Sequence, residues 1–170
     1  MTKRFIIFAF MLLAAMGMQA QSLMGSWKTT MTDEDDAKMD FYFIFTQSTL
    51  NMKGIVSQFD PEVGTVTVSV TVPCTYTRSG DKLTVKSKPN EAKINIDKMD
   101  FIGEIAEMMK KDPELKKMIE EQVKKTMEET KGEIVEEFPQ GGKLTIVSLT
   151  STKLTLRDDT DETTSFTKVR

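Results

Sequence analysis

The sequence contains no histidine and a single cysteine, Cys74. Without histidine, the chain cannot form a Ser-His-Asp or Cys-His catalytic group, an HExxH metalloprotease motif or an imidazole-based zinc site. One cysteine excludes both an intrachain disulfide and an all-thiolate zinc site. The chain also lacks a GxGxxG motif and a glycine-rich phosphate-binding loop. These absences exclude most enzyme classes, so we expect a non-enzyme with no catalytic residues, cofactor or bound metal.

Acidic residues outnumber basic residues, because the chain has 26 Asp and Glu against 23 Lys and Arg, which gives a formal net charge of −3. Nucleic-acid binding needs clustered Lys and Arg, so we expect no nucleic-acid partner. The lysines of the region 98–138 alternate with glutamates, which indicates a solvated helix face. These lysines are Lys110, Lys111, Lys116, Lys117, Lys124 and Lys125.

Cys74 follows Pro73 in a region rich in threonine and valine. The simplest interpretation is a small buried apolar side chain. An intermolecular disulfide and a reactive thiol are the alternatives, although no histidine is present to serve as its base.

Residues 1–20 have the pattern of a cleaved export signal. Lys3 and Arg4 form a positive start, Phe5–Ala15 is apolar, and Ala20 is a small residue at a plausible cleavage point. The apolar run is shorter than the ~20 residues of a spanning helix. We therefore expect an exported mature chain that begins at Gln21 and has no transmembrane segment. Loss of the two basic residues takes its net charge from −3 to −5.

The remainder, 21–170, predicts one β-rich domain with two blocks of short strands flanking a helical block. The clearest strand is 64–72, where valines alternate with hydroxyl residues, so four valines share one face. Pro73 is expected to limit or bulge this strand. Regular turn signals favour a sandwich or barrel, and closure into a barrel removes aggregation-prone edges. The nine expected strands are 25–30, 41–45, 50–56, 64–72, 82–86, 92–96, 143–149, 153–157 and 162–169.

Apolar residues at spacings of three and four predict helices over about 98–138, before the last strands. Asp112 is expected to be an N-cap, with Pro113 in the first helical position. Gly132 is expected to end or kink the helix. The predicted fold is therefore mainly β, an antiparallel up-and-down barrel of about eight strands with an α-helical insertion.

Three segments carry a family resemblance. Gly25-Ser26-Trp27 is similar to the Gly-x-Trp that begins the first strand of lipocalins, and 75–85 resembles a mid-barrel hairpin. Residues 149–158 with 165–169 resemble the closing hairpin and last strand. Together they resemble the lipocalin-like (calycin) domains of small exported Gram-negative bacterial proteins. The resemblance implies an up-and-down barrel, often with a cavity, in the periplasm, at the cell surface or in the medium.

Six residues are candidates for contact with a ligand. Phe41, Phe43 and Phe45 alternate and are expected to point inward, with Tyr76 in the same interior, where all four either line a cavity or fill the core. Methionines of the helical block, among them Met109 and Met118, either pack on the barrel or form a lid whose flexible side chains contact an apolar ligand.

Trp27 is the only tryptophan and is expected to close the barrel floor. The lipocalin resemblance implies a basic residue covering it, for which Arg157 and Arg170 are the first candidates and Lys168 the third. Two acidic segments, 33–36 and 158–162, are interpreted as solvated turns, because they fall far short of a calcium-binding loop.

The leading hypothesis is an exported, non-enzymatic protein that binds a small hydrophobic or amphipathic ligand in a barrel cavity. The alternative is a protein–protein interaction module or structural envelope protein, whose barrel is filled and whose helices dock a protein partner or a second copy. A carboxylate hydrolase is the third class, but no acid lies in an apolar context that would raise its pKa.

Overall fold

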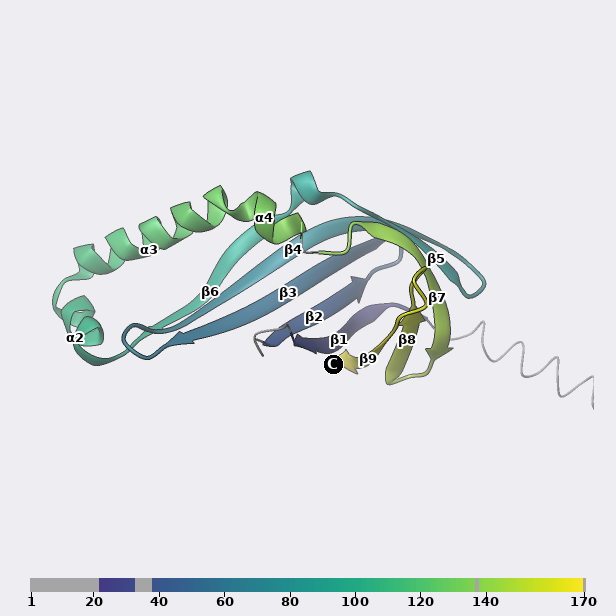
Figure 1. Cartoon of the computed structure of the whole chain (residues 1–170), viewed down its shortest axis with the longest axis horizontal. Helices are drawn as coiled ribbons and strands as arrows, with labels where there is room; N and C mark the ends of the chain where they lie inside the picture. The colour runs from purple at the N-terminus through teal and green to yellow at the C-terminus, as the bar shows by residue number, and fades with distance from the viewer. Residues whose placement is uncertain (1–21, 33–37, 137, 170) are drawn as a thin grey trace, which may run out of the picture.

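A computed structural model describes residues 22–32, 38–136 and 138–169 (Figure 1). The predicted signal 1–20, the expected mature start Gln21, the acidic segment 33–36 and Arg170 lie outside the described residues. The elements are β1 (Gly25–Thr32), β2 (Lys38–Phe45), β3 (Thr49–Asp60), β4 (Gly64–Ser79), β5 (Lys82–Ser87), η1 (Pro89–Glu91), β6 (Lys93–Phe101), α2 (Gly103–Lys111), α3 (Pro113–Glu129), α4 (Lys131–Glu136), β7 (Gly141–Leu149), β8 (Lys153–Arg157) and β9 (Thr163–Val169).

Eight of the nine strands in the described residues form a closed antiparallel barrel in the order β3-β2-β1-β9-β8-β7-β5-β4. The ring closes because β3 pairs with β2 along one edge and with β4 along the other. Strands that follow one another in the chain pair with one another in the barrel. β5 and β7 also pair, although β6 and the helices lie between them in the sequence. The predicted fold class, an up-and-down barrel with a helical insertion, is confirmed.

The ninth strand, β6, lies outside the barrel and pairs with the first half of β4. That half of β4, residues 64–71, extends with residues 54–60 of β3 and with β6 into a flat projection that we call the arm (Figure 1). The second half of β4 pairs with β5 and belongs to the barrel. One long strand therefore joins the two parts of the molecule.

Pro73 neither ends nor bulges β4, although the sequence predicted that it would limit or bulge the strand. It lies between Thr71, the last residue paired with β6, and Cys74, the first paired with β5. Its carbonyl accepts a hydrogen bond from Lys88 N at 2.9 Å. The N and C=O of a strand residue point to the same side, so the missing N–H faces the gap between β5 and β6. The β3–β4 ladder is therefore continuous past Pro73.

The helical insertion begins five residues later than predicted, at Gly103 rather than Lys98. Residues 98–101 belong to β6 and pair with β4, with Met99 opposite Val66 and Phe101 opposite Gly64. The apolar spacing of this segment fits a helix as well as a strand, and pairing with β4 decides for the strand.

The predicted start of α3 is confirmed. Asp112 caps the helix by accepting hydrogen bonds from the backbone N of Glu114 and Leu115, both at 3.0 Å. The helix ends at Glu129 with Thr130 as its C-cap, before Gly132, which is the second residue of α4. The Thr126 carbonyl accepts hydrogen bonds from both the backbone N and the hydroxyl of Thr130, each at 3.0 Å, at the C-terminal end of α3.

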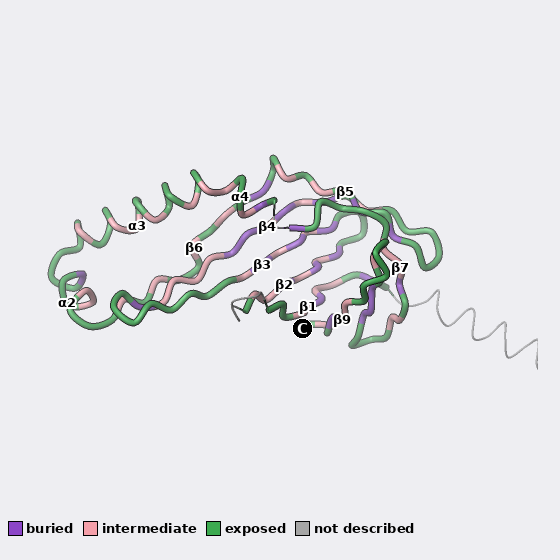
Figure 2. The backbone as a smooth tube through the Cα atoms, in the orientation of Figure 1, coloured by how far each residue is buried: buried purple, intermediate pink, exposed green. Residues whose placement is uncertain are grey.

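The alternating lysines and glutamates of α3 form its solvated face, as predicted. Lys116 lies 3.7 Å from Glu120, and Lys125 lies 3.9 Å from Glu129. Figure 2 shows α3 exposed or half-buried along its length, whereas the barrel strands alternate between buried and exposed positions.

The core fills the barrel around Trp27, Leu50, Leu83 and Leu154, none of which has measurable solvent exposure. Trp27 Nε1 donates to the carbonyl of Leu23 at 2.6 Å, so the indole is buried without an unsatisfied donor. The end of the barrel where β1 begins is therefore closed by side chains.

Candidate ligand-binding site

The opposite end of the barrel, where β2 and β7 begin and β8 ends, faces the helices and is called the helix end. Two pockets lie there, one on each side of the segment that joins α4 to β7. Phe138 lines one of them and the next residue, Pro139, lines the other.

The first, here the barrel pocket, has a volume of about 280 Å³. Its floor is aromatic and aliphatic, and its rim carries Lys143 and three carboxylates. The lining residues are Met31, Phe41, Phe43, Met52, Val85, Pro139, Gly141, Gly142, Lys143, Leu144, Leu156, Asp158, Asp159, Glu162, Thr164 and Phe166.

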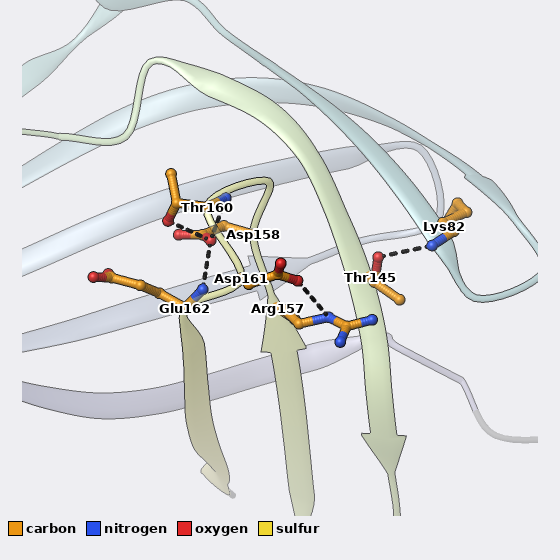
Figure 3. A network of polar contacts seen from close by, with 7 residues as sticks. All are labelled: Lys82, Thr145, Arg157, Asp158, Thr160, Asp161 and Glu162. Carbon is orange, nitrogen blue, oxygen red and sulfur yellow. Dashed lines mark hydrogen bonds and ion pairs between the residues drawn. The ribbon is translucent and has the colours of Figure 1, made fainter.

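The acidic rim belongs to the turn between β8 and β9 (Figure 3). One oxygen of Asp158 accepts hydrogen bonds from the Thr160 hydroxyl and from the backbone N of Thr160 and Glu162, at 2.8 to 2.9 Å. These bonds, the hydroxyl's first, hold the pKa of Asp158 below its usual value. The carboxylate therefore organises its own turn, which fits the interpretation of 158–162 as a solvated turn.

The second, here the helix pocket, has a volume of about 370 Å³ and lies between the arm and helices α3 and α4. Strand valines form one wall, and helix side chains form the other. The lining residues are Met39, Gly54, Val56, Gln58, Val66, Val68, Val70, Val123, Met127, Ile134 and Phe138. Gln58 is the one polar side chain among these residues, and none of them is charged. The volume falls in the ordinary range of small-molecule sites.

The floor of the helix pocket is built by strand register. Gln58 pairs with Val66, Val56 with Val68, and Gly54 with Val70, so these side chains share one face. Exposure falls along the series, because Val56 and Gln58 are exposed whereas Gly54 and Val70 are buried. The pocket is therefore open toward the tip of the arm and closed toward the barrel.

Phe138 closes the inner end. The residue is 6% exposed, and the centroid of its ring lies 5.8 Å from that of Phe41, which lines the barrel pocket. The ring lies over Gly54, where a methyl group would come within 2.7 Å of Phe138 Cζ and 3.0 Å of Met39 Sδ. The amide of Gln140 holds the backbone here by donating to the carbonyls of Val135 and Phe138, at 3.2 and 3.1 Å.

The sequence-predicted aromatic residues lie inside the barrel as expected, mostly in packed core. Phe43 stacks on Phe166 at 5.0 Å between centroids, and Phe45 meets Tyr76 edge-on at 5.2 Å. The Tyr76 hydroxyl donates to the Thr46 carbonyl at 2.9 Å, which satisfies its polar end. Phe41 and Phe43 line the barrel pocket, whereas Phe45 and Tyr76 line neither pocket.

The two methionines predicted to contact a ligand, Met109 and Met118, lie outside both pockets. Met109 is buried within the helical block, and Met118 is 59% exposed on α3; neither contributes to either pocket described here. The methionine of the helical block that lines the helix pocket is Met127, on the same helix as Met118, and Met39 of β2 lines the pocket as well. Periodicity placed Met118 near the apolar stripe, but the packing of α3 on the arm leaves that position outside.

Sequence reasoning also missed Gly54 and Phe138. A signal for Gly54 was present, because a glycine inside a strand pattern indicates a close approach by another group. Phe138 carried no such signal, since a lone phenylalanine after a helix predicts burial but no particular partner.

The cation over Trp27 is Lys168, whose Nζ lies 5.0 Å from the centroid of the ring. Lys168 is the third of the sequence candidates. Arg157, one of the two preferred, instead lies 3.7 Å from Asp161 in the exposed β8–β9 turn (Figure 3). Strand register decides this, because Trp27 pairs with Lys168 across β1 and β9.

Cys74 is 3% exposed, and its thiol contacts the Val72 carbonyl at 3.5 Å. Burial raises the pKa of this thiol to about 11, although a hydrogen bond from the Met52 backbone opposes the shift. The interpretation of Cys74 as a buried apolar side chain is confirmed.

Among residues 22–32, 38–136 and 138–169, no group of three or more acidic or cysteine side chains is arranged to hold a metal ion. None of the helices described is both long enough and apolar enough to cross a bilayer.

Comparison with family models, with curated proteins and with solved structures gives no match.

Proposed function

We propose that this protein is an exported, non-enzymatic binding protein for a small apolar or amphipathic molecule, and that the ligand occupies the helix pocket. The observation that carries the proposal is the lining of that pocket, in which apolar side chains from three strands and two helices surround about 370 Å³. Burying apolar ligand surface there contributes roughly 25 cal/mol per Å². Met39 and Met127 add flexible side chains that adjust to different ligand shapes.

The export signal and the lipocalin resemblance support the same proposal. A Gram-negative envelope location, in the periplasm or at the surface, offers lipids and other amphipathic molecules to such a pocket. The proposed site differs from the barrel cavity expected from sequence, since the helix pocket lies between the arm and the helices.

A paired substitution on α3 tests the proposal. Met127→Glu introduces a carboxylate into the apolar pocket, where an unpaired charge is costly, and is expected to abolish binding of the neutral fluorophore N-phenyl-1-naphthylamine. Met118→Glu makes the same change on the same helix at an exposed position and should leave binding at the wild-type level. Equal binding by both variants would place the ligand elsewhere.

The natural ligand is identified by native mass spectrometry of the protein purified from the cells that make it, with solvent extraction in parallel. A reproducible added mass that extracts into organic solvent, and that is absent from Met127→Glu, supports the proposal. An added mass of equal size in both glutamate variants argues against the helix pocket.

The alternative function, docking of a protein partner or second copy, has one supporting observation. Apolar side chains are exposed near the tip of the arm, where Ile102 N donates to the Val63 carbonyl at 3.1 Å. Val63 and Ile102 are exposed there, and Phe59 of the adjoining strand end is 64% exposed. Concentration-dependent sedimentation that disappears in Phe59→Ser would favour this alternative.

A further inference from the structure

We propose that the helix pocket takes a single-chain amphiphile tail first and that Phe138 sets the longest chain it accepts. This inference rests on the proposed function, which it extends by naming the class of ligand, its direction and a specificity-determining residue.

The shape of the pocket favours a ligand with one extended apolar tail. Its floor covers the three register pairs from Gln58–Val66 to Gly54–Val70, a length of ~13 Å at ~3.3 Å per residue. A space of about 370 Å³ lies along that floor, so the pocket is elongated in the direction of the strands. It is therefore a slot that one extended chain can follow from its open end to its closed end.

The polarity of the two ends of the slot indicates which end of the ligand enters first. Gln58 lies at the exposed outer end and can hydrogen-bond a polar head group, whereas Gly54, Val70 and Phe138 at the inner end are buried. Because no charged side chain is among the described lining residues, the head group is uncharged or remains in water. The apolar tail therefore points toward the barrel.

The inner end is a wall with a second cavity behind it. The ring of Phe138 fits against Gly54 on one side and Phe41 on the other. Phe41 lines the barrel pocket of about 280 Å³, and so does Pro139, which follows Phe138 in the chain. A chain that reaches Phe138 can go no further, and removing the ring would lengthen the slot toward Phe41.

The experiment is a chain-length series of linear 1-alkanols from six to sixteen carbons, measured by displacement of N-phenyl-1-naphthylamine. For wild-type protein, affinity should rise about fourfold per added methylene until the chain fills the slot, and then stop rising. In Phe138→Ala the rise should continue to longer chains. Phe59→Ala removes an exposed phenylalanine outside both pockets and should keep the wild-type break point.

Phe138→Leu serves as a second variant if the alanine variant does not fold, because it keeps most of the buried apolar volume. It should move the break point in the same direction by a smaller amount. Near-ultraviolet circular dichroism and Trp27 emission check that each variant keeps its packing.

The outcomes separate the two proposals. A wild-type break point that stays in place in both Phe138 variants overturns the role of Phe138 and leaves the proposed function standing. An absence of any break point, with affinity rising through sixteen carbons, also overturns it. Failure of wild-type protein and Phe59→Ala to bind either the fluorophore or any alcohol overturns the proposed function and this inference together.

Discussion

Replacing Gly54 with alanine should destabilise the protein, although glycine is a poor strand residue. In an ordinary strand this substitution contributes about 0.5–1 kcal/mol of stability, because alanine loses less backbone entropy on folding. Here the new methyl group would lie 2.7 Å from Phe138 Cζ and 3.0 Å from Met39 Sδ. Met39 can move, but the Phe138 ring is rigid and packed against Phe41.

Overpacking of this kind costs about 1–3 kcal/mol, which outweighs the entropic gain. We therefore expect Gly54→Ala to lower the free energy of unfolding by about 1–2 kcal/mol, measured by urea titration of Trp27 fluorescence. A matched control is Gly132→Ala in α4, where a methyl group would meet no atom within 4 Å. That variant should gain about 0.5–1 kcal/mol.

A double-mutant cycle isolates the contact. In a Phe138→Ala background the ring is gone, so Gly54→Ala should become neutral or stabilising. The coupling energy between the two positions is expected to be about 1–3 kcal/mol. If Gly54→Ala leaves the wild-type protein as stable as before, or if the two substitutions add without coupling, then Phe138 does not fill the space over Gly54 and the wall between the pockets is not as described.

Further predictions concern three other places in the chain. Lys168→Met removes the cation over Trp27, and it should cost about 0.5–2 kcal/mol of stability and alter tryptophan emission. Arg157→Met should change neither, because the Arg157 side chain is exposed at the end of β8 beside Asp161. Equal effects of the two substitutions would contradict the assignment of Lys168. Folded protein should react with iodoacetamide at Cys74 at least ~100-fold more slowly at pH 8 than urea-unfolded protein, because its pKa is about 11 rather than 9.0. Because folding raises the pKa of this thiol, its neutral form stabilises the folded state fully below pH 9, and that contribution is lost as the pH rises to 11. Cys74→Ala should therefore flatten the pH dependence of the free energy of unfolding, measured by urea titration. An unchanged pH dependence in this variant would contradict the raised pKa. Asp112→Ala should cost α3 about 1 kcal/mol and speed amide hydrogen exchange over 113–129, while exchange in the barrel strands stays unchanged.

Much of the barrel could be predicted because its signals are local. Valines alternating with hydroxyl residues over 64–72 follow the two-residue period of a strand, and the Ser79–Lys82 turn determines where the chain reverses. The start of α3 was equally predictable, since Asp112 and Pro113 satisfy the free backbone groups of a helix without help from distant residues.

The candidate site was less predictable because pairing and packing decide it. Residues 98–101 have apolar spacing that suits either a helix or a strand, and β4 selects the strand. Met118 and Met127 both lie near the apolar face of α3, but only the fit of that helix onto the arm makes Met127 a lining residue.

By itself, the sequence determined that this is a β-rich chain without histidine chemistry, with strands enough to close a barrel and a capped helical insertion. These features follow from residue periodicity and side-chain chemistry, which act over a few neighbouring residues. Only the tertiary structure decided that Lys168 covers Trp27, that α3 lies over the arm, and that Phe138 separates two pockets. Those contacts join residues far apart in the chain, and the closure of the barrel sets their register, which no local pattern encodes.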